Sequence, residues 1–320
     1  MSPMPPTPPS LPLSGWVLFI VVVLTLLAID LARAARQPQA PSVKSALGGC
    51  AFWVALALAF NAFVYVWRGP EAAWQFFAGY LIEESLSVDN LFVFVMIFSY
   101  FRVPPDCQRR VLFLGILGAI FMRMIFIVVG VALVARFHWI IYLFGVFLVY
   151  TGYKMATEQD KEIEPDKNPV LKLVRKWIPV TTQYEGGRFF VRQNGRWHAT
   201  PLFVVLVAVE TTDVIFAVDS IPAVMAISSD AFIIFTSNVF AVLGLRALYF
   251  ALSGMMGLFH HLHYGLAVIL AFVGIKMLLS GIYPIPIAIT LGVVVATLAL
   301  SILASLWRPA HGQKPPMPPV

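Results

Sequence analysis

Long apolar segments separated by short polar connections dominate the sequence. Each is close to the ~20 residues that an α-helix needs to cross the hydrocarbon core of a bilayer. The chain is 60% hydrophobic and only 12% charged, and its mean hydropathy is +0.84, a profile that excludes a soluble domain. We therefore predict an all-α, polytopic membrane helix bundle with about nine transmembrane helices. The predicted spans are 15–34, 46–67, 75–100, 111–134, 137–154, 201–226, 232–252, 264–281 and 286–307.

The distribution of Lys and Arg predicts the orientation of these helices. If the N-terminus lies outside, most of the 22 Lys and Arg residues fall on the inner side, and only Arg68 and Arg136 fall on the outer side. Cytoplasmic connections carry such an excess of positive charge. We therefore expect the N-terminus outside and the C-terminus in the cytoplasm. The net charge of +6 reflects this orientation, and we expect no nucleic-acid partner.

The remaining segments are two tails and one long connection. Residues 1–12 and 308–320 are Pro-rich, and we expect them to be disordered on either side of a transmembrane domain at 13–307. The connection at about 155–200 would lie in the cytoplasm. It contains a basic amphipathic segment at 168–177, typical of a helix on the membrane surface, and a hairpin signal around Asn194-Gly195. This connection is either a clasp between two halves of the protein or a docking site for cytoplasmic proteins.

The sequence contains an internal repeat, with one copy at about 75–155 and the other at about 201–281. Gly152-Tyr153-Lys154-Met155 resembles Gly274-Ile275-Lys276-Met277, and Arg123 corresponds to Arg246. Because each copy holds three helices, an odd number, the second copy enters the membrane from the opposite side. Inverted repeats of this kind place a transporter's binding site near the midplane, between the two copies.

Each copy begins with a helix that carries acidic residues. When Val88-Asp89-Asn90 is laid over Val218-Asp219-Ser220, Glu83 falls on Asp213. An ionised side chain at the centre of a membrane costs at least ~2.5–3.5 kcal/mol, and such residues are usually functional. The structural alternative is that an acid pairs with Arg123 or Arg246 and clamps two helices together.

The two helices together would supply a set of oxygen ligands. Hard divalent cations such as Mg²⁺, Ca²⁺ and Mn²⁺ prefer oxygen, and neither motif contains the Cys or His typical of Zn²⁺, Cu⁺ or Fe–S sites. The primary candidates are Glu83, Asp89, Asn90, Glu210, Asp213 and Asp219. The secondary candidates are Glu84, Ser87, Thr211, Thr212, Ser220, Asn238, Arg123 and Arg246.

The geometry of a straight helix leaves two arrangements open for these candidates. Glu83, Ser87 and Asn90 would share one helical face, whereas Asp213 and Asp219 would not. Either the helix is unwound near Pro222, which removes a backbone donor, or each carboxylate points into a different gap.

Transport is the function that these features predict, and we expect neither an enzyme nor a resident cofactor. Several acids in one apolar site cannot all remain ionised without a cation. Protons would fill the site when it is empty and leave when a metal ion binds, so a cation/proton antiporter is the hypothesis. Its partners would be the lipid bilayer, a divalent metal ion and protons.

Four stretches closely resemble the TerC/Alx family of bacterial membrane proteins. They are Glu83–Asn90, Val209–Pro222, Leu243–Tyr249 and Gly187–Phe190. The resemblance implies a multi-pass protein of the bacterial inner (plasma) membrane that exports manganese from the cytoplasm, with a link to tellurium resistance. On this resemblance, Glu83, Asp89, Asp213 and Asp219 occupy the acidic positions of the family. Two alternatives remain: a membrane scaffold for tellurite- or stress-resistance proteins, and an exporter of another cation or a small solute.

Overall fold

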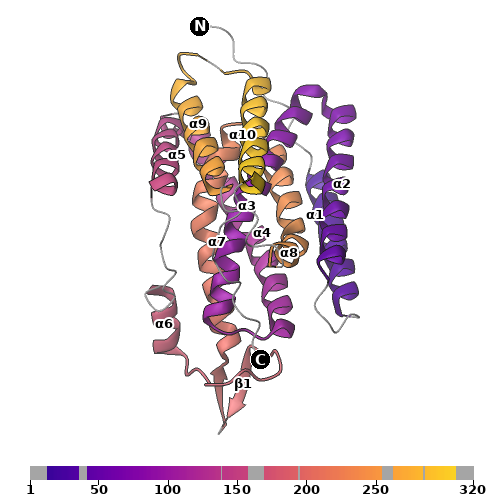
Figure 1. The fold of residues 1–320 in the computed structure, drawn as a ribbon, viewed down its shortest axis with the longest axis vertical. Coiled ribbons are helices and arrows are strands. Elements are labelled where there is room, and N and C mark those ends of the chain that lie inside the picture. Colours follow the sequence, from indigo (N-terminus) through magenta and orange to yellow (C-terminus); the bar gives the residue numbers. More distant parts are fainter. Residues whose placement is uncertain are drawn as a thin grey trace.

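A computed structural model of the chain describes residues 13–35, 42–137, 139–157, 169–193, 195–253, 262–283 and 285–307. Nine long helices and one short one lie within these ranges, which confirms the predicted helix bundle (Figure 1). The tails predicted to be disordered, 1–12 and 308–320, lie outside the described residues. The long helices are α1 (Leu13–Ala35), α2 (Val43–Arg68), α3 (Pro70–Tyr100), α4 (Pro105–Arg136), α5 (Ile140–Thr157), α7 (Pro201–Met225), α8 (Ala231–Ser253), α9 (Leu262–Leu279) and α10 (Ile287–Trp307).

Six of these helices are long and apolar enough to cross a membrane, judged on the described residues alone. Helices α1 and α9 contain shorter apolar stretches, at Ser14–Asp30 and His263–Leu279. Helix α3 is 31 residues long but carries several acids in its sequence. The chain is therefore a membrane-embedded, multi-pass protein.

The connection between α5 and α7 contains the two elements predicted for it. Helix α6 (Pro169–Trp177) is short, and strands β1 (Phe190–Gln193) and β2 (Arg196–Ala199) form an antiparallel hairpin with Gln193 opposite Arg196. Gly195 has a positive φ of 78°, as a tight hairpin turn requires, and Asn194 lies outside the described residues. The hairpin projects from one end of the bundle (Figure 1), which we call the hairpin end.

Two hydrogen bonds attach the segment before the hairpin to the turn after α3 and to the start of α4. Arg110 donates to the carbonyl oxygen of Gly187 at 3.0 Å, and the Tyr184 hydroxyl donates to the carbonyl oxygen of Phe101 at 2.8 Å. Burial raises the pKa of Tyr184 to about 12, so this hydroxyl remains a donor at neutral pH. These contacts show that α3 ends at the hairpin end, where α7 begins, so the two helices run in opposite directions.

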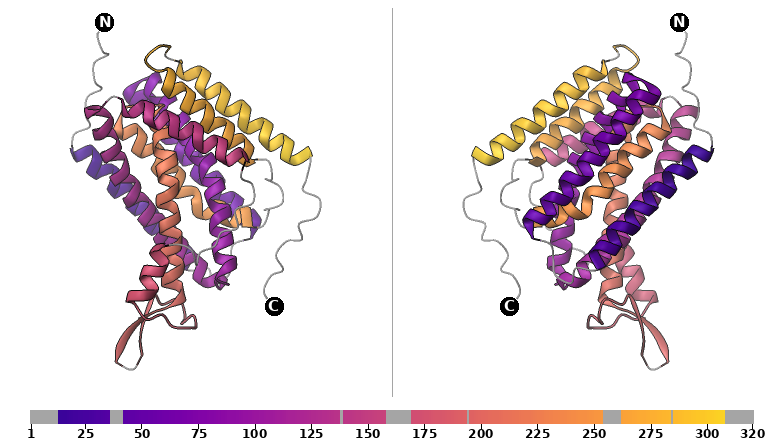
Figure 2. Two further views of the ribbon diagram at one scale, coloured as in Figure 1. Left: turned by 90° about the vertical axis from the view of Figure 1, so that its left-hand side faces the viewer. Right: turned by 90° about the vertical axis from the view of Figure 1, so that its right-hand side faces the viewer.

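Helix packing follows the inverted repeat. In the repeat, α3 corresponds to α7, α4 to α8 and α5 to α9. The structure packs α3 on α8 and α4 on α7, which are the two contacts that the repeat interchanges, and it packs α5 on α9. Helices α5, α9 and α10 lie side by side as one layer in Figure 2. These contacts are the ones expected of two copies related by a pseudo-two-fold axis.

At the crossing of α5 and α9, single residues of the two copies also make corresponding contacts. A Cβ atom added to Gly145 would lie 2.9 Å from the carbonyl oxygen of Gly274, and one added to Gly152 would lie 2.7 Å from that of Ala267. Gly152 and Gly274 occupy corresponding positions in the two copies, as do Gly145 and Ala267. The two contacts are therefore images of each other, and small residues let the backbones touch.

The substitution Gly274→Ala tests this crossing. The new Cβ would lie 2.7 Å from the Gly145 carbonyl oxygen and 2.9 Å from the Val149 nitrogen, and both are backbone atoms that cannot move aside. We expect a loss of roughly 1–3 kcal/mol in the free energy of unfolding, measured by denaturation in detergent. Gly292→Ala on α10 is the control, because its added Cβ meets no atom within 4 Å. Equal stability of the two variants would contradict the close crossing.

Helices α1 and α2 lie outside the repeat and cover α8. Phe19 of α1 contacts Phe232 at a ring-centroid distance of 5.7 Å, and Phe60 of α2 contacts Phe240 at 4.7 Å. These aromatic pairs bury one side of α8. The opposite side of α8 faces the polar residues described next.

Candidate functional site

A guanidinium group lies at the centre of the two repeats. Arg123 of α4 is only 1% exposed and forms salt bridges with Glu83 of α3 and Asp213 of α7. Its Nη2 donates to Asp213 Oδ1 at 3.2 Å and its Nε to Asp213 Oδ2 at 3.4 Å, so this carboxylate is bound by both its oxygens. Its Nη1 donates to Glu83 Oε1 and to Asn238 Oδ1 of α8, the latter at 3.2 Å, and lies 3.5 Å from Ser220 Oγ of α7.

We call Glu83, Arg123, Asp213, Ser220 and Asn238 the central cluster. Its acids come from corresponding positions of the two copies. Ser220 lies seven residues after Asp213, which is two helical turns, so both side chains point from one face of α7. Each of the five residues is at most 3% exposed. The cluster therefore joins one helix pair from each repeat in the interior of the bundle.

The charges of the central cluster do not balance. Two carboxylates face one guanidinium, which leaves a formal negative charge in a region of low dielectric. The hydrogen bonding is incomplete as well. Within the described part of the chain, Glu83 Oε2 and Asn238 Nδ2 are buried without a hydrogen-bond partner, and so is Ser87 Oγ one turn along α3. Unpaired buried polar atoms are costly, and they often mark functional sites.

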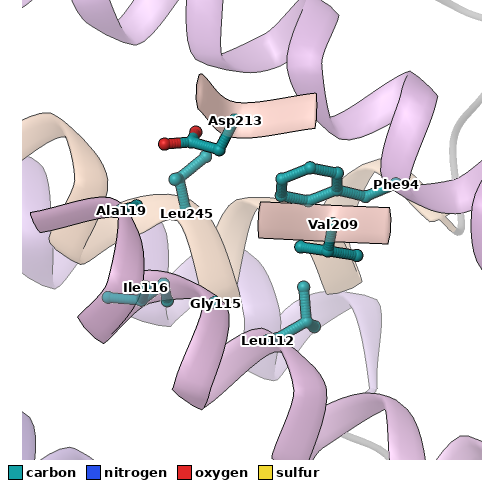
Figure 3. Close-up of a pocket in the computed structure, with 8 residues that line it drawn as sticks. All are labelled: Phe94, Leu112, Gly115, Ile116, Ala119, Val209, Asp213 and Leu245. Carbon is teal, nitrogen blue, oxygen red and sulfur yellow. The ribbon is translucent and has the colours of Figure 1, made fainter. Parts of the chain in front are cut away.

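A small cavity adjoins the cluster on the side of the hairpin end. Its volume is about 10 Å³, close to what a single water molecule requires. Asp213 is its only charged lining residue, and Figure 3 shows the others, which are apolar. They are Phe94, Leu112, Gly115, Ile116, Ala119, Val209 and Leu245. Next to Asp213, this cavity is therefore small and lined by hydrophobic side chains.

Helix α7 continues without interruption through Pro222 to Met225, so the suggested unwinding near Pro222 is wrong. On α7 the other arrangement holds, because Asp213 and Asp219 face different gaps. Asp219 is half-buried, accepts a hydrogen bond of 3.3 Å from Thr151 of α5 and interacts electrostatically with Lys154. Glu210 lies against α4, where its carboxylate fills the space beside Gly118 that a Cβ atom would need.

The remaining candidates are distributed around the cluster. Asn90 is 5% exposed, on the face of α3 that carries Glu83 and Ser87, as the helical spacing predicts. Glu84 faces a separate gap, near Gly244 of α8 and in hydrogen-bonding contact with Tyr80. The structure does not describe the side chain of Asp89. Among the side chains that are described, no group of three Asp, Glu, His or Cys residues is arranged to hold a metal ion.

Three secondary candidates point away from the cluster. The hydroxyl groups of Thr211 and Thr212 donate to backbone carbonyls one turn earlier in α7, at 2.6 Å and 2.8 Å. Arg246 binds Asp30 of α1 at 2.5 Å. The two arginines that correspond in the repeat therefore differ in role, because only Arg123 binds the central acids.

The sequence pattern did not single out the partners of the outlying charged residues. They are Thr151 for Asp219, Gly118 for Glu210, Tyr80 for Glu84 and Asp30 for Arg246. A polar or small residue in an otherwise apolar span was the available signal, but such residues also serve ordinary helix packing.

Sequence comparisons place the chain among known membrane proteins. Residues 68–313 match the family described as "Integral membrane protein TerC family". A protein of Salmonella typhi named "Putative membrane-bound redox modulator Alx" is 50% identical over 302 residues, covering 91% of this chain and 94% of its own. Its namesake in Escherichia coli K12 is 48% identical over 303 residues, with the same coverage.

A relative from another organism matches over the same part of the chain, and the comparison with solved structures found no match. An uncharacterized membrane protein of Myxococcus xanthus is 48% identical over 296 residues, covering 92% of this chain and 93% of its own. No solved structure matches the chain significantly. The family match and these identities agree with the resemblance read from the acidic motifs, and the chain belongs to the TerC family of integral membrane proteins.

Proposed function

We propose that this protein transports divalent cations across the bacterial inner membrane and exports Mn²⁺ from the cytoplasm. The observation that carries the proposal is the central cluster. Two acids at corresponding positions of an inverted repeat meet in the interior of the bundle, where transporters with this architecture bind their substrates. The excess of Lys and Arg at the hairpin end supports a cytoplasmic position for that end.

The chemistry of the cluster fits a hard cation. Apart from Arg123, its polar groups offer carboxylate oxygens from Glu83 and Asp213, a hydroxyl oxygen from Ser220 and an amide oxygen from Asn238. Mg²⁺, Ca²⁺ and Mn²⁺ prefer such oxygens. We propose these four residues as the cargo cage. We also propose Asp89, Asn90, Glu210 and Asp219 as further cation-binding residues along the route to it.

Exchange with protons completes the proposal. A site with several acids in an apolar setting takes up protons when its cation leaves. Mn²⁺ moving outward would therefore be coupled to protons moving inward, which makes use of the proton gradient of a bacterial membrane. The cation-binding acids then serve both substrates in turn.

Flux measurements on the purified protein in liposomes test this function. We expect vesicles that contain the protein to take up Mn²⁺. An imposed pH gradient with an acidic interior should increase the rate of this uptake. Competition by Mg²⁺, Ca²⁺ and Zn²⁺ gives the order of preference. Absence of flux for every divalent cation would reject transport, whereas flux that ignores the pH gradient would reject only the exchange with protons.

A scaffold is the second candidate function, and one observation favours it. Trp177 at the end of α6 and Trp197 in the hairpin are 76% and 66% exposed, as side chains that bind a partner protein often are. Replacing residues 190–199 by a short Gly-Ser connection separates the two functions. If the protein is a transporter, the altered protein keeps its Mn²⁺ flux. If it is a scaffold, the altered protein no longer binds its partner proteins, and neither it nor the wild type shows flux.

A further inference from the structure

We infer that Arg123 is a tethered counter-cation, which fills the cargo cage when no metal ion is bound and must leave it when a metal ion binds. This inference rests on the proposed function, because it assigns a role to the one positive group inside the proposed site. It makes Arg123 the residue that sets the affinity of the cage for its substrate.

The first argument is geometric. The guanidinium already occupies the oxygen atoms that a cation would need: both oxygens of Asp213, Oε1 of Glu83 and Oδ1 of Asn238. Its planar fork of donors suits two carboxylates at once. A metal ion bound to both oxygens of Asp213 would lie beside the guanidinium that donates to them, and the two positive charges would repel each other. Metal and guanidinium therefore compete for the same atoms.

The second argument is electrostatic. With Arg123 in place and both acids ionised, the two acids and the guanidinium sum to a charge of −1, which one bound proton would neutralise. If a divalent ion joined them, the buried sum would become +1, and an unbalanced buried charge is strongly unfavourable. If the divalent ion replaced Arg123, the sum would be zero. Exchange is therefore favoured over joint occupancy.

The third argument concerns how the exchange begins. Glu83 Oε2 and Ser87 Oγ are buried on the same face of α3 and have no hydrogen-bond partner among the described residues. They offer an arriving cation its first oxygen ligands before Arg123 releases Asp213. Arg246, the corresponding arginine of the second copy, is held by Asp30 at 2.5 Å. Because of this, the cage contains a single arginine and keeps the negative charge that attracts a cation.

Titration calorimetry of the purified protein with Mn²⁺ tests the inference in wild type, Arg123→Lys and Arg123→Ala. We expect Arg123→Ala to bind Mn²⁺ at least about tenfold more tightly, because removing one nearby positive charge is worth more than the 1.4 kcal/mol that tenfold represents. Arg123→Lys should lie between, since an ammonium group cannot bridge both acids with a fork of donors. Millimolar guanidinium chloride should weaken Mn²⁺ binding to Arg123→Ala and leave wild type unchanged, because the free ion can occupy the emptied place.

The outcomes separate this inference from the proposed function. If wild type binds and transports Mn²⁺ but Arg123→Ala binds it no more tightly, or guanidinium does not compete, the counter-cation role is wrong and transport stands. If neither wild type nor any variant binds a divalent cation, the proposed function fails as well. Should Arg123→Ala not fold, Arg123→Lys decides, because Mn²⁺ binding equal to or weaker than that of wild type overturns the inference.

Discussion

Replacing Asp213 by Asn is expected to abolish Mn²⁺ transport while leaving the fold intact. The substitution removes one of the two acids of the cage, and with it the negative charge that remains beside Arg123. Changes in residues that merely support metal ligands weaken binding by 10–100-fold, so loss of a charged ligand should cost roughly 100-fold or more. The fold should persist because Glu83 and Arg123 then form a neutral pair. Flux into liposomes and the thermal midpoint of the purified variant measure the two effects.

Asp106→Asn provides the matched control for this prediction. It makes the same chemical change in a carboxylate that is 82% exposed and pairs with neighbouring Arg109 at the surface. We expect its flux to equal that of wild type, and Glu83→Gln to reproduce the loss seen with Asp213→Asn. Full transport by a folded Asp213→Asn protein would remove this residue from the cargo site.

The overall fold could be predicted from the sequence because its determinants are local. Spans of about 20 apolar residues give the helices, and Asn194-Gly195 gives the hairpin. The seven-residue spacing of Glu83 and Asn90 also predicted a shared buried face, and both side chains are buried. Each of these inferences needs only the periodicity of a helix or the geometry of a turn.

The partners of the charged residues could not be predicted in the same way. Arg123 and Arg246 occupy corresponding positions, yet one binds Glu83 and Asp213 and the other binds Asp30. The difference arises from α1, which lies outside the repeat and supplies an acid to only one of the two arginines. The continuity of α7 through Pro222 is a similar case, because neighbouring helices in a bundle can compensate for a lost backbone hydrogen bond.

Removing the arginine should have the largest effect on stability. In Arg123→Gln, the carboxylates of Glu83 and Asp213 would remain buried with no positive partner in the central cluster. Taking away one member of a buried salt bridge typically costs 3–5 kcal/mol, and we expect a loss of about that size. The free energy of unfolding, measured by denaturant titration in detergent without divalent cations, gives the value.

Two comparisons test whether the loss of stability in Arg123→Gln arises from the charge of the cage. The triple variant Arg123→Gln, Glu83→Gln, Asp213→Asn has no charge in the cluster and should recover most of the lost stability, because neutral groups replace a buried ion network at little cost. Mn²⁺ should also stabilise Arg123→Gln more than wild type, since a ligand that binds only the folded state raises the free energy of unfolding by an amount that grows with the logarithm of its affinity. An Arg123→Gln protein that is as stable as wild type would show that the guanidinium does not compensate these acids. A destabilised Arg123→Gln protein that ignores Mn²⁺ would mean that the gap left by the arginine is not a metal site.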